Sequence, residues 1–91
     1  MSKFTAGQRY VSHNHPDFTL RIRSRGTKYI SGTIRYTERK KVWSPALKKY
    51  VVDVIPHRIP FEKLKYNKNG DSDDVWVYFE EYGIRVGFKS E

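Results

Sequence analysis

Cations set among aromatic rings are the residues of this 91-residue chain best suited to chemistry. The window from Arg21 to Lys49 holds ten Lys or Arg residues and a single acid, Glu38. Guanidinium and ammonium groups bind phosphate oxygens, and aromatic rings stack on nucleic-acid bases. We therefore expect a nucleic-acid-binding surface formed by Arg21, Arg23, Arg25, Tyr29, Arg35, Arg39, Lys40, Lys41, Trp43, Lys48 and Lys49.

The same residues have two plainer interpretations. Exposed strands often carry Lys and Arg because charge discourages pairing between the edges of neighbouring molecules. The aromatic residues make up 15% of a chain that has only three leucines, so the core could require all of them. If they are exposed instead, Tyr50, Trp76 and Tyr78 are further candidates for base stacking.

Acid–base catalysis has few candidate residues. The histidines His13, His15 and His57, together with Glu62 and Arg58, have the side chains that metal-independent cleavage of RNA requires. No spacing among them defines a site, and a surface or structural role is the default for each. We therefore expect no catalytic residue and no enzyme, and keep a small ribonuclease-like toxin as a third alternative.

Metal binding has two candidate segments. His13 and His15 would point the same way from a strand, near Asp17, but a catalytic zinc site normally needs three protein ligands. The segment that begins at Asn67 alternates oxygen ligands as calcium loops do, yet it lacks the glycine and glutamate that an EF-hand has at its sixth and twelfth positions. We expect neither a metal nor a cofactor.

The chain contains no cysteine, which excludes disulfides, thiol nucleophiles and thiolate zinc sites. Its first residues include no apolar stretch, and no apolar run approaches the length of a membrane span. We expect no signal peptide, no membrane association and a cytoplasmic location, in the host cell if the protein is phage-encoded.

The elements that would position these residues are strands. From Phe18 to Arg25 the sequence has period two, with Phe18, Leu20 and Ile22 on one face, which is the pattern of a half-buried strand. This alternation would place Arg21, Arg23 and Arg25 together on the exposed face. Residues 28–43 form a second extended run with Gly32 as a bend or bulge, and residues 48–55 form a third.

Between the second and third runs, Ser44–Leu47 reads as a β-turn because proline occupies its favoured second position. The two runs and this turn predict a projecting basic hairpin at 35–50. Further strands are expected at 9–11, 75–79 and 84–88. Pro56 would end the third run, and Pro60 would begin a short helical turn near 60–66.

Five or six short strands and one helical turn fit a single all-β domain, residues 1–91, that closes as a small barrel. An SH3-like barrel places a one-turn helix just before its last strands, and the turn near 60–66 has that position. An OB-fold is the alternative, with its helix between the third and fourth strands.

The segments FTAGQRYVS, TLRI and IPFEKL resemble the small SH3-like barrels common in phage and prophage genomes. Those proteins open with G-x-x-Y before the first strand and have a proline-bounded turn that ends in leucine. Gly7, Tyr10, Pro60 and Leu64 match this pattern, and the basic hairpin departs from it. The resemblance implies a fold and a phage-type origin, and it assigns no functional residue.

Net charge is +8, and it is concentrated in the first three quarters of the chain, which favours a polyanionic partner. The function expected first is non-catalytic nucleic-acid binding through phosphates, with stacking by Trp43 and Tyr29. The alternative is a phage-type interaction or inhibitor protein whose hairpin docks on an acidic surface of a host protein. Phosphate contacts read no sequence, so DNA or RNA, base preference, and monomer or dimer stay open.

Overall fold

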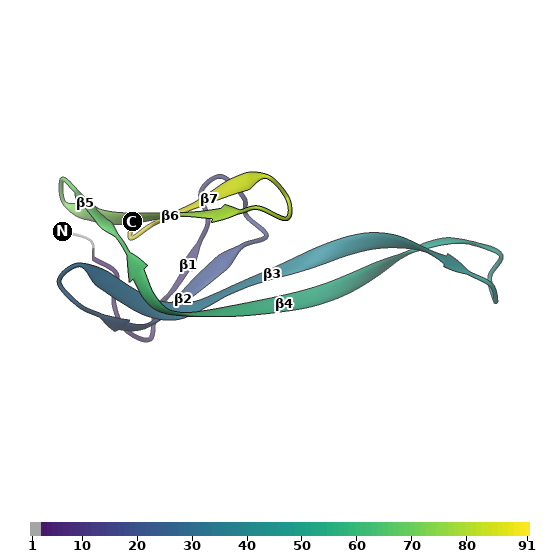
Figure 1. Ribbon diagram of the computed structural model, residues 1–91, viewed down its shortest axis with the longest axis horizontal. Helices are drawn as coiled ribbons and strands as arrows, with labels where there is room; N and C mark the ends of the chain where they lie inside the picture. Colours follow the sequence, from purple (N-terminus) through teal and green to yellow (C-terminus); the bar gives the residue numbers. More distant parts are fainter. Residues whose placement is uncertain (1–2) are drawn as a thin grey trace.

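The computed structural model describes residues 3–91, which fold into seven strands and no helix (Figure 1). Met1 and Ser2, at the start from which we expect no signal peptide, lie outside the described residues. The strands are β1 (Arg9–Val11), β2 (Thr19–Arg25), β3 (Tyr29–Ser44), β4 (Lys49–Lys65), β5 (Asn67–Asn69), β6 (Ser72–Phe79) and β7 (Ile84–Lys89). They form two antiparallel sheets, β1-β2-β3-β4 and β5-β6-β7, so the predicted all-β class is confirmed.

The hydrophobic core lies between the two sheets. Leu20 and Ile34 from the first sheet and Val75 and Val86 from the second are among its fully buried side chains. The sheets also meet next to β1, where the backbone N–H of His13 donates to the carbonyl of Gly87 at 3.3 Å. Because the strands are hydrogen-bonded as two sheets, the predicted five- or six-stranded barrel is not confirmed.

Strands β3 and β4 form one long hairpin that extends far beyond the rest of the molecule (Figure 1). Their pairing ends at Ser44 and Lys49, and Pro45–Lys48 closes the turn. The molecule measures 54 × 21 × 20 Å as a result. We call residues 37–56 the arm and the remainder the body; from residue 39 to residue 54 no side chain is buried. The projecting basic hairpin expected from the sequence is therefore present.

The prediction of a helical turn near 60–66 is wrong, because residues 60–65 continue β4 as a strand. Pro56 does not end the strand either; it pairs with Thr37, and Pro60 pairs with Thr33. Strand β4 is at the edge of its sheet, and an edge strand tolerates proline where the missing N–H would face away from its neighbour. No helix among residues 3–91 is long and apolar enough to cross a membrane.

Two bulges interrupt the first sheet. One lies between Ile22 and Ser24 in β2, and the other lies between Phe61 and Leu64 in β4, opposite Ser31 of β3. A Cβ atom on Gly32 would overlap the carbonyl group of Arg21, so only glycine permits this close approach of the two strands. The β2 bulge adds one residue and reverses which face the following side chains occupy.

Candidate nucleic-acid interface

The face of the first sheet that points away from the core carries the most concentrated positive charge. We call it the outer face and the opposite, core-side face the inner face, and both continue along the arm. Side chains directly opposite each other in a sheet share a face. Arg9 lies opposite Arg21, and Arg35 lies opposite Arg58, so the outer face holds two facing pairs of arginines.

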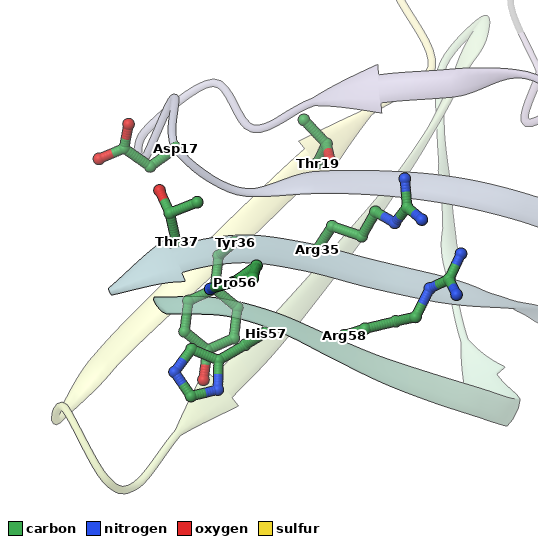
Figure 2. Close-up of a pocket in the computed structure, with 8 residues that line it drawn as sticks. All are labelled: Asp17, Thr19, Arg35, Tyr36, Thr37, Pro56, His57 and Arg58. Atoms are coloured by element: carbon green, nitrogen blue, oxygen red, sulfur yellow. The ribbon is translucent and has the colours of Figure 1, made fainter. Parts of the chain in front are cut away.

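Three of these arginines, Arg21, Arg35 and Arg58, line two adjoining hollows. The first, of about 560 Å³, lies where the arm leaves the body, and the second, of about 390 Å³, lies over the centre of the sheet. Arg35 and Arg58 line both of them, and Figure 2 shows their side chains extending together from β3 and β4. Asp17 is the one acid lining the hollows, at the end of the first that is far from the two guanidinium groups (Figure 2).

Within residues 3–91 only Arg25 and His57 form ion pairs, so no carboxylate neutralises Arg9, Arg21, Arg35 or Arg58. Like charges directly opposite each other destabilise a sheet. An anion placed between them would relieve this repulsion, and a guanidinium can bind a phosphate through two parallel hydrogen bonds. The outer face is therefore suited to phosphate.

Arg25 does not belong to this face, contrary to its expected place beside Arg21 and Arg23. The β2 bulge turns it to the core side, where its Nε donates to the Asp73 carboxylate at 3.1 Å and its guanidinium lies 5.0 Å from the centre of the Tyr66 ring. Asp73 also accepts the backbone N–H of Phe4 at 2.9 Å. Arg23, the bulged residue, lines the second hollow.

Along the arm, the outer face continues without acids. Its cross-strand pairs from the body to the tip are Thr37–Pro56, Arg39–Val54, Lys41–Val52 and Trp43–Tyr50. The inner face has the pairs Glu38–Ile55, Lys40–Asp53, Val42–Val51 and Ser44–Lys49. The predicted arm cations therefore divide by face, and Lys48 lies in the turn with a left-handed backbone (φ 52°).

The aromatic residues of the arm tip are exposed rather than buried. Trp43 is 54% exposed and meets Tyr50 edge-to-face, with ring centres 5.2 Å apart.

The other aromatic candidates lie on the body. Tyr29 is partly covered by Lys63, whose Nζ lies 4.4 Å from the centre of the Tyr29 ring. Trp76 and Tyr78 are exposed on the second sheet, away from the outer face.

At the root of the arm, a stack of rings occupies the inner face. Tyr36 lies between Phe18 and His57, with ring centres 4.6 and 4.7 Å away (Figure 2 shows the Tyr36–His57 part). His57 Nε2 is 2.9 Å from a Glu38 carboxylate oxygen, to which the Tyr82 hydroxyl donates at 3.4 Å. The hydrogen bond between the Tyr36 and Tyr82 hydroxyls raises the pKa of Tyr82 above its usual value.

The residues considered for catalysis and metal binding are dispersed. His13 packs against Trp76 and His15 against Phe18, while His57 pairs with Glu38. Among residues 3–91 no three His, Asp or Glu side chains are grouped so that they could hold a metal ion. The register places the His57–Glu38 pair and the Arg35–Arg58 pair on opposite faces of the hairpin, although His57 lines the first hollow together with both arginines.

Sequence reasoning missed Arg9 and considered Arg58 only for catalysis, not for phosphate binding. Arg58 follows Pro56, which looks like the end of a strand in the sequence, so no face is assigned to the residue. The alternation Ile55, His57, Ile59 and Phe61 was the available signal, because it places Arg58 opposite the apolar residues. Arg9 lies in a three-residue strand, which is too short to show a period.

No protein-family model, curated protein or solved structure matches this chain. The assignment of a site therefore rests on the geometry above.

Proposed function

We propose that this protein binds nucleic acid without catalysis, mainly through phosphates. The observation that carries the proposal is the outer face, where the facing pair Arg35–Arg58 lines two adjoining hollows, Arg21 and Arg23 line the second, and no ion pair neutralises these four arginines. Arg21, Arg23, Arg35 and Arg58 would bind the backbone on the body, and Arg39 and Lys41 would extend the contact along the arm. Trp43 and Tyr29 are the candidates for stacking.

The other cations of the arm, Lys40, Lys48 and Lys49, would add to the field that attracts a polyanion rather than form the same contact surface. Two wider expectations belong to this proposal. One is a cytoplasmic location, and the other is a small SH3-like barrel of the phage type, with the OB-fold as its alternative. Neither is needed for the phosphate-binding geometry.

The test is the salt dependence of affinity for mixed-sequence DNA and RNA. Each phosphate contact releases a counterion, so affinity should fall steeply as salt rises. Replacing Arg35 and Arg58 by glutamine should weaken binding to every sequence and reduce the slope of log affinity against log salt by about 2. A salt-independent affinity, or no binding at low salt, would contradict the proposal.

A control is available on the second sheet. Lys68→Gln with Lys89→Gln removes the same amount of charge from a surface outside the outer face. This double variant should bind nearly as the wild type does. If it weakens binding as much as the Arg35–Arg58 variant, net charge alone is responsible and the outer face has no special role.

One observation favours the second candidate, docking on an acidic surface of a host protein. Val52, Val54 and Tyr50 are 57%, 59% and 68% exposed on the arm, and tyrosine and arginine are enriched at protein interfaces. Affinity capture from a nuclease-treated lysate of the host tests it. A single acidic protein retained by the wild type but not by Val52→Asp would support docking, and no such protein would count against it.

A further inference from the structure

On the outer face of the arm, two successive cross-strand pairs each combine a cation with a valine. Arg39 lies opposite Val54, and Lys41 lies opposite Val52. The two valines are more than half exposed, and no part of the body covers them. Phosphate binding explains the cations, but it gives no reason for aliphatic side chains in water at the same positions.

Base edges in the major groove of DNA present both complementary groups. Guanine offers O6 and N7 as acceptors to Arg or Lys, and thymine offers a methyl group to apolar side chains. A cation beside a valine therefore matches a guanine next to a thymine or close to it. The next pair, Trp43 and Tyr50, adds apolar surface at the tip.

The dimensions of the arm agree with this groove. Its two strands lie about 4.8 Å apart, and a two-stranded ribbon fits the major groove of B-form DNA, which is about 12 Å wide, but not the minor groove of about 6 Å. The seven residue steps from Thr37 to Ser44 span about 23 Å. A-form RNA has a major groove too narrow and deep for side chains to read.

The two faces of the arm differ in whether they carry acidic residues. The outer face has no acid, whereas the inner face carries Glu38 and Asp53. Carboxylates would be repelled by phosphates and by the acceptor-rich groove floor, so the outer face is the one that turns toward DNA. By strand register it continues the face that carries Arg35 and Arg58.

We propose that the arm reads base edges in the major groove of B-form DNA, with Arg39 and Lys41 on guanine and with Val52 and Val54 on thymine methyl groups. This inference rests on the proposed function and adds a substrate class and sequence preference to it. The body arginines hold the backbone, and the arm selects the sequence.

The first experiment selects duplexes from a random-sequence DNA pool with the wild-type protein. A consensus containing guanine and thymine is expected. In the selected duplex, deoxyuridine in place of a contacted thymidine should weaken binding about fourfold for each methyl lost, and 7-deazaguanine should weaken it about tenfold. Netropsin, which occupies the minor groove, should not compete.

Variants then assign the contacts. Val52→Thr with Val54→Thr keeps β-branched side chains but replaces one methyl of each by a hydroxyl, and it should reduce the discrimination between thymidine and deoxyuridine, since each threonine keeps one methyl. Val42→Thr with Val51→Thr makes the same change on the inner face and should keep the full discrimination between thymidine and deoxyuridine. Arg39→Gln should lose the sensitivity to 7-deazaguanine.

The results of these experiments distinguish base reading by the arm from nucleic-acid binding through phosphates. Selection without a consensus, indifference of the wild type to deoxyuridine and 7-deazaguanine, or equal affinity for duplex RNA would overturn base reading by the arm. If binding remained steeply salt-dependent in those cases, nucleic-acid binding through phosphates would stand. The modified-base measurements use the wild-type protein, so they decide the matter even if a variant fails to fold.

Discussion

Tyr82 connects the second sheet to the root of the arm through its hydroxyl. That group meets the Tyr36 hydroxyl at 3.2 Å and the Glu38 carboxylate at 3.4 Å. The bond with Tyr36 raises the pKa of Tyr82, and the nearby Glu38 carboxylate raises it further, because ionisation would place a second anion beside that carboxylate. The neutral phenol is thus the form that the folded structure favours.

This shift has a consequence at alkaline pH. Because the pKa of Tyr82 is higher in the folded state than the usual tyrosine value of 10.0, the unfolded chain loses the proton first. The stabilising contribution is complete below pH 10 and is lost as pH rises through the folded-state pKa. Between pH 8 and pH 11 the wild type should therefore lose more stability than Tyr82→Phe in urea denaturation.

Tyr78→Phe is the matched control for this measurement. Tyr78 is 60% exposed, so removal of its hydroxyl should leave the alkaline loss of stability as large as in the wild type. Equal losses in the wild type and in Tyr82→Phe would show that the Tyr36–Tyr82 bond does not couple folding to pH.

At the scale of the elements, most strand positions follow from the sequence. Period-two alternation locates β2, β6 and β7 to within a few residues, because in each of them one face is buried and the other is not. The errors come from features that alternation alone does not encode. Prolines on an edge strand looked like strand ends, and a single bulged residue moved Arg25 to the other face.

The site is predictable only in part, for a related reason. The cations of β2 and of the arm are evident in the sequence, but the pairing of Arg35 with Arg58 depends on the register of β3 and β4. That register is set by the turn at Pro45–Lys48, because the pairing continues without a shift from Ser44–Lys49 to Gly32–Phe61. A linear search for basic runs does not detect two arginines that lie far apart in the chain and face each other in a sheet.

The body should still fold when most of the arm is removed. Residues 40–53 can be replaced by Asn-Gly, a two-residue turn that would close the hairpin at the Arg39–Val54 pair. Because no arm side chain in this segment is buried, the melting temperature should change by no more than about 5 °C. A shortened protein that unfolds at room temperature would show that the arm contributes to the body's core. Replacing the same segment by a longer Gly-Ser loop provides the control for turn strain.

For the molecule as a whole, the arm makes the shape unusual for its length. The Cα radius of gyration is 16.0 Å, whereas a compact chain of this size has about 12 Å. Small-angle X-ray scattering should give the larger value for the free protein and about 12 Å for the shortened one. A value near 12 Å for the full chain would mean that the arm folds back on the body in solution.

The unpaired edge of strand β4 should affect how readily molecules of this protein associate in solution. The strand has this unpaired edge throughout, and its stretch Lys49–Ile55 is rich in valine and contains no proline. Mutual repulsion between molecules of charge +8 keeps such edges apart, and salt shortens the range of that repulsion to about 10 Å at 0.1 M. Concentrated solutions should therefore become turbid as salt is added, and light scattering belongs beside every salt titration of this protein.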